Sequence, residues 1–144
     1  MRDLAIVGGD LLVSGGDLAT VTGTDYLRQR VATALSEPYG SDPFHPQWGS
    51  ALTGMLGSPQ LAGTGAMVTA EASRVLAQLM AAQQQVITAT AMAGTRSQLA
   101  ADDVIASVDS VTAAPGSRPD AIAVAVSLTT QGGQRLSAVR TVSP

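Results

Sequence analysis

The chain has 144 residues, a formal net charge of −3 and a charged fraction of 13%, with no cysteine and no lysine. The missing cysteines exclude disulfides, thiolate metal sites and cysteine nucleophiles, and the missing lysines exclude a P-loop phosphate site. The net negative charge argues against nucleic acid as the main partner. No apolar run approaches the roughly 20 residues that span a bilayer, so we do not expect a membrane partner.

Residues 4–22 read as short β-type runs separated by Gly-Gly-Asp steps. The steps begin at Gly8 and Gly15, and glycine supplies the positive φ that tight hairpin turns require. Calcium-binding β-helix repeats also use Gly-Gly and Asp, but they need a nine-residue period and several copies. The spacing here is seven, with two copies of the step. The pattern therefore favours a β-meander over a calcium site.

A helix is predicted over residues 24–36, because apolar side chains recur at i, i+4, i+7 and i+8 and form one face. Thr24 is the expected N-cap, since its hydroxyl can accept a free backbone N–H at the start of the helix. Pro38 disfavours helical geometry at the residue before it, so we expect the helix to end there. The apolar face consists of Leu27, Val31, Ala34 and Leu35.

Residues 36–50 read SEPYGSDPFHPQWGS and contain the only Phe, the only His and the only Trp of the chain. Three prolines restrict the unfolded chain and thereby favour an ordered loop. Two interpretations remain for Tyr39, Phe44 and Trp48. The rings seal the core beneath the loop, with Trp48 largely buried, or one or two of them stay at the surface and anchor a partner. His45 has no second histidine and no convincing nucleophile beside it, so we expect neither a catalytic nor a metal role for it.

Two helices are predicted in the middle of the chain. Ser50 is a plausible cap for a short helix over 51–56. From about residue 65, apolar and polar side chains occupy opposite faces of what should be the longest helix. On its polar face, Glu71 and Arg74 can pair at i, i+3.

The pattern changes from helix to strand in the last third. Residues 86–101 begin with β-branched side chains and continue rich in alanine, and we expect a continued or second helix that breaks near Gly94. A strand is predicted over 104–113 and a loop over 114–120. Residues 121–142 then alternate with period two around a Gly-Gly turn, which predicts a β-hairpin.

The predicted fold class is therefore α+β. It has short N-terminal β-hairpins or a meander, central helices and a C-terminal antiparallel β-hairpin or sheet. The length suits a single domain over 1–144. The charged fraction of 13% is about half the usual ~25%, which favours permanent assembly with other chains.

No arrangement for catalysis emerges from the sequence. Glycoside cleavage needs two facing carboxylates, whereas Asp102 and Asp103 are adjacent and their side chains diverge. We therefore expect no enzyme activity, no catalytic residue, no cofactor and no metal. A small hydrolase that depends on His45 is the minor alternative.

Four motifs, in this order, carry a resemblance to a known family. They are Gly-Asp-Leu at 16–18, Leu-Arg-Gln-Arg-Val at 27–31, Pro-Tyr-Gly at 38–40 and Pro-Gln-Trp-Gly-Ser-Ala-Leu at 46–52. The chain resembles the sheath initiator of contractile phage tails, also called the lysozyme-like baseplate wedge protein, which is related to subunits of type VI secretion baseplates. Asp102-Asp103-Val104 stands where the family has Glu-Pro-Arg.

The resemblance implies a structural subunit that lies in a ring of copies around the tail tube. Its partners would be baseplate wedge proteins, the tail tube or tube-initiator protein, and the tail sheath protein, which a C-terminal β-hairpin would recruit by β-augmentation. Its location would be the virion, in a tail baseplate assembled in the host cytoplasm. Another tail subunit, such as a terminator or tube-associated protein, and an adaptor unrelated to phage are the alternatives. The candidate interface residues are Pro38, Tyr39, Trp48, Asp102, Asp103, Leu136, Ala138, Val139, Arg140 and Val142.

Overall fold

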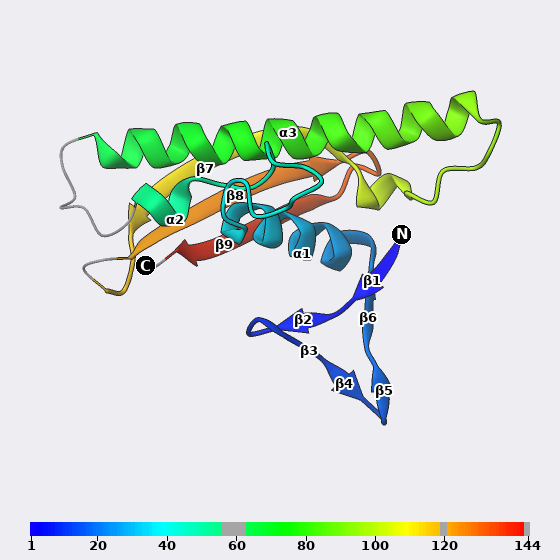
Figure 1. The fold of residues 1–144 in the computed structure, drawn as a ribbon, viewed down its shortest axis with the longest axis horizontal. Coiled ribbons are helices and arrows are strands. Elements are labelled where there is room, and N and C mark those ends of the chain that lie inside the picture. The colour runs from blue at the N-terminus through cyan, green and yellow to red at the C-terminus, as the bar shows by residue number, and fades with distance from the viewer. Residues whose placement is uncertain (56–62, 119–120, 143–144) are drawn as a thin grey trace.

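The computed structural model of the chain describes residues 1–55, 63–118 and 121–142. Short strands come first, helices follow, and a three-stranded antiparallel sheet ends the chain, so the predicted α+β class is confirmed (Figure 1). The described residues contain no helix with the length and hydropathy needed to cross a membrane. The elements are β1 (Arg2–Leu4), β2 (Ile6–Val7), β3 (Asp10–Leu11), β4 (Val13–Ser14), β5 (Asp17–Leu18), β6 (Thr20–Thr22), α1 (Gly23–Ser36), α2 (Leu52–Met55), α3 (Thr64–Met92), η1 (Ala101–Asp103), β7 (Ile105–Pro115), β8 (Ile122–Thr130) and β9 (Arg135–Val142).

The N-terminal strands form three two-stranded antiparallel arms, β1–β6, β2–β3 and β4–β5, which extend away from the rest of the molecule (Figure 1). The turns of the second and third arms lie at the two predicted Gly-Gly steps, where all four glycines have positive φ. The arms meet at three residues spaced seven apart. Ala5 N–H donates to the Ala19 carbonyl (2.8 Å), Leu12 N–H to the Ala5 carbonyl (2.9 Å) and Ala19 N–H to the Leu12 carbonyl (2.8 Å). These three hydrogen bonds close a ring.

The ring contains three seven-residue repeats, although the Gly-Gly step occurs in only two of them. Asp-Leu pairs occur at 3–4, 10–11 and 17–18, again seven residues apart. In each pair the aspartate carboxylate accepts a hydrogen bond from the N–H of the following leucine, at 2.8–2.9 Å. The first copy has no Gly-Gly step in front of it, and a search for that step therefore overlooks it.

Helix α1 begins earlier than predicted, at Gly23. Its N-cap is Thr22, which has extended backbone geometry and makes no side-chain cap hydrogen bond, so the assignment of Thr24 as the cap is wrong. The reason is that strand β6 continues directly into the helix through Gly23, whose φ is +59°. The predicted apolar face is confirmed at Leu27, Val31 and Leu35, which are at most 1% exposed, with Ala34 packed beside them.

Helix α3 settles the ambiguous segment 86–101. The helix continues to Met92, and the chain turns at Gly94, where φ is +66°. The short helix α2 is present, and the Ser50 hydroxyl accepts the Leu52 N–H (3.0 Å) as predicted. The predicted end of that helix, residue 56, lies outside the described residues.

The C-terminal sheet has the strand order β7-β8-β9 and packs on both long helices. Helix α1 contacts β9, and α3 contacts β7 and β8. Alternate residues of β8 enter the core, as the period-two pattern predicts, while the residues between them are half-buried. Strand β7 extends to Pro115, two residues beyond the predicted strand. The core residues of β8 are Ile122, Val124, Val126 and Leu128.

Candidate docking site

Strand β9 forms an edge of the sheet whose outward backbone groups pair with no other strand among the described residues. Its pairing with β8 runs without a register shift, and Thr130 N–H donates to the Gln134 carbonyl (2.9 Å) at the hairpin turn. In an antiparallel pair, bonded and non-bonded positions alternate. Counted from this bond, Ser137, Val139 and Thr141 direct their N–H and C=O groups away from β8. The Val139 side chain is 69% exposed.

The opposite edge, formed by β7, is irregular. Register shifts occur between Ile105 and Ser107 and again between Val108 and Ser110. Such bulges twist an edge strand and hinder pairing with another chain. Asp109, within the second shift, accepts hydrogen bonds from the hydroxyls of Thr129 (2.8 Å) and Ser107 (2.9 Å). The Thr129 bond and then the Ser107 bond lower the pKa of the Asp109 carboxyl below its usual value, so this edge carries a charge. Of the two edges, β9 is the better suited to accept a strand.

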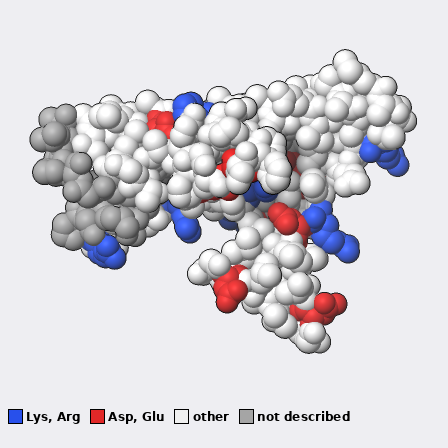
Figure 2. All heavy atoms as spheres, viewed as in Figure 1, with Lys and Arg blue, Asp and Glu red and all other residues white. Residues whose placement is uncertain are grey.

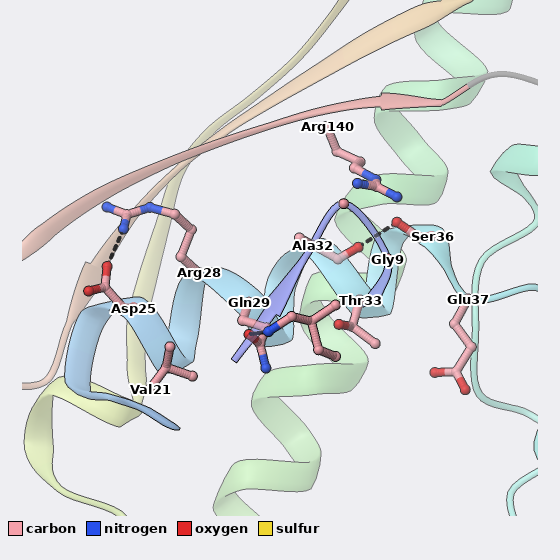
Figure 3. A pocket seen from close by; sticks show the side chains of 12 residues that line it. Gly9, Val21, Asp25, Arg28, Gln29, Ala32, Thr33, Ser36, Glu37 and Arg140 are labelled. Atoms are coloured by element: carbon pink, nitrogen blue, oxygen red, sulfur yellow. Dashed lines mark hydrogen bonds and ion pairs between the residues drawn. The ribbon is translucent and has the colours of Figure 1, made fainter. Parts of the chain in front are cut away.

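An open groove of about 540 Å³ lies beside β9 (Figure 3). One wall is the turn between β2 and β3, and the floor is the outer face of α1. Arg28 links this face to the sheet edge: its Nε approaches the Ser137 carbonyl (3.5 Å) and its guanidinium pairs with Asp25. Arg140 projects from β9 over the other end of the groove (Figure 3). The groove therefore adjoins the free edge of the sheet.

The aromatic loop is ordered, and its two ends are joined by backbone hydrogen bonds. Ser50 N–H donates to the Glu37 carbonyl (2.7 Å), and Tyr39 N–H donates to the Ser50 carbonyl (3.0 Å). Gly49 has a φ of +99° and lies against the carbonyl of Pro38 so closely that a Cβ there would collide with it. Only glycine fits this position without distortion.

Helix α3 holds the loop through three polar side chains. Glu71 accepts the Ala51 N–H (2.8 Å) and pairs with Arg74 (2.7 Å), as the i, i+3 spacing predicts. Arg74 also donates to the Gly49 carbonyl (2.8 Å), and Gln78 donates to the Gln47 carbonyl (2.9 Å). The hydrogen bond from Arg74 lowers the pKa of the Glu71 carboxyl. The sequence indicates the pair but not its role in holding the loop.

Two of the three aromatic rings of the loop lie at the surface. Tyr39 is 57% exposed and Phe44 is 88% exposed, whereas most of the Trp48 side chain is shielded from solvent. The guanidinium carbon of Arg74 lies 5.5 Å from the centre of the Tyr39 ring, a cation–π distance. Of the two interpretations of this loop, the structure favours the one with rings at the surface.

His45 lies on the exposed side of the loop. Its Nδ1 is 2.9 Å from the Asp42 carboxylate, and its ring centre is 5.5 Å from that of Trp48. The His45 hydrogen bond is the largest cause of the lowered pKa of Asp42. Among the residues that the structure describes, no group of three or more His, Cys, Asp or Glu side chains could hold a metal ion.

Asp102 and Asp103 precede β7, and their side chains make contacts inside the molecule. Asp103 is fully buried and accepts hydrogen bonds from the Ala100 N–H (2.8 Å) and from the amino group of Met1. Asp102 accepts the Thr130 hydroxyl (3.3 Å) and lies against Gly132 of the hairpin turn. As a docking residue, Asp103 is therefore a wrong assignment, because its side chain does not reach the surface.

The candidate interface residues separate into three places. Pro38, Tyr39 and Trp48 lie on the aromatic loop, while Asp102 lies against the hairpin turn and Asp103 is buried beside residues 1 and 100. On β9, Leu136 and Ala138 are 2% and 7% exposed, so the side chains of these two candidate interface residues do not reach a partner. The other β9 residues are the exposed Val139 and Arg140, together with Val142, whose backbone ends the strand.

The sequence did not reveal the groove. Its floor on α1, at Arg28, Ala32 and Ser36, belongs to the helix face beside the apolar one, which by itself resembles any solvated helix surface. Its wall at Gly8 and Gly9 reads only as a hairpin turn. The groove forms because the β2–β3 arm, α1 and β9 come together in the folded chain. A local sequence pattern cannot predict such long-range proximity.

No protein-family model matches the chain, and no curated protein matches its sequence. Its fold is similar to that of a crystal structure from Geobacter sulfurreducens described as a "putative tail lysozyme", with a TM-score of 0.57 and 13% sequence identity. The likeness covers 81% of this chain and 86% of the other. At this level of identity, the comparison shows a shared fold.

Proposed function

We propose that the chain is a structural subunit of a contractile phage-tail baseplate, a sheath initiator that offers β9 as a template for the sheath. The observation that carries the proposal is the regular, unpaired edge of β9, next to a β7 edge disrupted by bulges. The name of the Geobacter protein supports a tail context for this fold, and the order of the four sequence motifs supports the baseplate.

The mechanism is strand addition. An extended segment of the sheath protein pairs with the outward N–H and C=O groups of β9, centred on Val139 and Thr141, and these main-chain hydrogen bonds supply the affinity. Side chains on alternate positions fix the register of the added strand. The hairpin turn is held by Asp102 and by the backbone of residues 101–104, so the template is rigid before the partner arrives.

Two other surfaces suit the remaining partners. The aromatic loop presents Tyr39 and Phe44 on a backbone fixed by α3, and we assign it to the baseplate wedge proteins. Much of the face in Figure 2 carries neither Lys or Arg nor Asp or Glu, which fits a subunit covered by neighbours in a ring around the tail tube or tube-initiator protein. The whole of 1–144 acts as one domain in this role, within the virion.

A lytic enzyme is the second candidate, because the Geobacter protein is named for one. The carboxylates that line the groove are Asp25 and Glu37, twelve residues apart on and just after α1. Along a helix this separation is about 18 Å, whereas glycosidases place their two carboxyl groups roughly 5–9.5 Å apart. We therefore propose a non-catalytic subunit. Release of soluble fragments from peptidoglycan by the purified chain would favour the enzyme instead.

The decisive experiment replaces Val139 with proline. The substitution removes an N–H that faces away from β8, so the hairpin is retained while strand addition is obstructed. We expect Val139→Pro to fold and to bind wedge proteins but to leave tail tubes without sheath, as seen by electron microscopy of assembled tails. Val139→Ala is the matched control, since it shortens the side chain and keeps the N–H. Sheathed tails with a folded Val139→Pro subunit would contradict the proposal.

A further inference from the structure

The groove beside β9 runs in the direction that an added strand would take. Arg28 approaches Ser137 at one end (3.5 Å), and Arg140 lies over Ser36 at the other (Figure 3). From Arg28 to Ser36 the helix advances about 12 Å, and from Ser137 to Arg140 the strand advances about 10 Å. Helix α1 and strand β9 therefore run side by side in the same direction, with the groove along both.

A strand that pairs with β9 would place half of its side chains in this groove. Neighbouring strands lie about 4.8 Å apart, so the added strand lies just outside β9 and above the outer face of α1. Its side chains alternate between the two faces of the sheet. Those on the helix side point at α1, where the turn of the β2–β3 arm closes the far wall.

The chemistry of the groove differs along its length. The middle of the floor is small and uncharged: Ala32 offers a methyl group, and the Ser36 hydroxyl already donates to the Ala32 carbonyl (2.7 Å). At one end, Arg28 is neutralised by Asp25. At the other, Arg140 has no hydrogen-bond or ion-pair partner among the described residues. Glu37 also lines the groove, but its carboxylate points away from Arg140 (Figure 3).

We propose that the groove selects its strand: it takes an extended peptide segment with a carboxylate side chain where the strand passes Arg140 and a small side chain where it passes Ala32. The inference rests on the proposed function, since it assumes that the partner pairs with β9. It adds the chemical identity of the paired segment and gives the β2–β3 arm the role of a wall. Arg140 thus sets both register and partner choice.

The test uses the purified full-length chain and three capped eight-residue peptides of alternating Thr and Val. One central position is Glu, Gln or Lys. Binding is followed by NMR through the backbone amides of Val139 and Thr141. We expect the Glu peptide to bind about two- to fivefold more tightly than the Gln peptide, the range of a cross-strand charge pair, and the Lys peptide to bind most weakly. Arg140→Glu should invert this order.

Arg135→Glu is the matched control. It makes the same charge change on the same strand, but it lies five positions from Arg140, so its side chain lies on the other face of the sheet. This variant should keep the preference for Glu. Equal binding of the three peptides, inversion by Arg135→Glu, or no shift at Val139 and Thr141 with any peptide would overturn the groove proposal.

The same titration, followed at Thr141 because proline has no N–H at position 139, separates this proposal from the one on which it rests. Val139→Pro should lose all three peptides, because it blocks the backbone pairing. Equal affinities in the unmodified chain, with loss in Val139→Pro, would overturn selection by the groove and leave strand addition standing. Unchanged binding in Val139→Pro would overturn strand addition itself.

Discussion

Gly49 is the residue on which the shape of the aromatic loop depends most directly. Its φ is +99°, and a Cβ would lie 2.9 Å from the Glu37 carbonyl oxygen and closer still to that of Pro38. We predict that Gly49→Ala lowers the free energy of unfolding by about 1–3 kcal/mol in a urea titration.

Gly40→Ala is the matched control for Gly49, since Gly40 also has a positive φ, +76°, but its nearest neighbour to a Cβ is 3.5 Å away. The Gly40→Ala variant measures the loss of stability caused by a positive φ alone. The additional loss in Gly49→Ala is then due to the collision of the Cβ with the Pro38 carbonyl. A Gly49→Ala protein no less stable than Gly40→Ala would show that the close approach to Pro38 is not a constraint.

Glu71 should make the loop sensitive to acid. Arg74 lowers the pKa of the Glu71 carboxyl in the folded chain below its ordinary 4.5. A lowered pKa means that the pair stabilises the fold fully above about pH 4.5 and loses that contribution as the pH falls through the folded value. We predict that Trp48 fluorescence reports loosening of the loop in this acid range. The variant Glu71→Gln should already lack this contribution at neutral pH, and an acid response equal to that of the unmodified chain would contradict the assignment.

At the scale of elements, the contact between α1 and the sheet positions both the groove and β9. Leu35, 1% exposed, belongs to the core on which β9 also packs. We predict that Leu35→Ala costs about 2–5 kcal/mol, measured as a shift of the thermal or urea transition. Leu18→Ala, at a leucine 44% exposed on β5, should change stability by less than about 0.5 kcal/mol. Equal effects of the two substitutions would reject this packing of α1.

Elements with a strong local period were predictable from the sequence. The alternation from Ile122 to Leu128 and the repeating apolar face of α3 depend only on neighbours along the chain. The start of α1 at Gly23 was not predictable, because Thr24 is an ordinary cap residue and the incoming strand decides the outcome. The bulges of β7 were missed for a similar reason: they arise from pairing with β8.

The candidate site divides in the same way. The exposed edge at Val139 follows from a hairpin at the end of the sequence, which local patterns predict. The burial of Asp103 cannot be predicted from local patterns, since acidic residues are usually exposed. This one accepts hydrogen bonds from the backbone nitrogens of residues 1 and 100. The groove is lined by residues as far apart in the sequence as Gly9 and Arg140, so it can be found only in the folded structure.

At the scale of the whole molecule, the three arms and the helix–sheet body are joined through Gln29 of α1. Its side chain donates to the Leu4 carbonyl (2.7 Å) and accepts the Ile6 N–H (2.9 Å). The arms expose many of their apolar side chains, Val7 and Val13 by more than 60%, so their order comes from hydrogen bonds more than from a core.

We predict that Leu12→Pro opens the junction of all three arms. It removes the N–H that bonds the Ala5 carbonyl, and hydrogen exchange at the amides of Ala5 and Ala19 should accelerate together. Leu12→Ala keeps the N–H and loses a side chain that is 42% exposed, so both amides should remain protected. Independent exchange at Ala5 and Ala19 would show that the ring does not act as a unit.

The closed ring has a further consequence for how these arms come apart. In an ordinary hairpin, the backbone hydrogen bonds at the open end of the strand pair break first, and the others follow in order. The three hydrogen bonds of the ring have no such end, since each one is flanked by the other two. If any one of the three hydrogen bonds breaks, the remaining two each lose a neighbouring bond and become easier to break. We therefore expect the arms to populate two states, all closed or all open, with a single loose arm as the scarce intermediate.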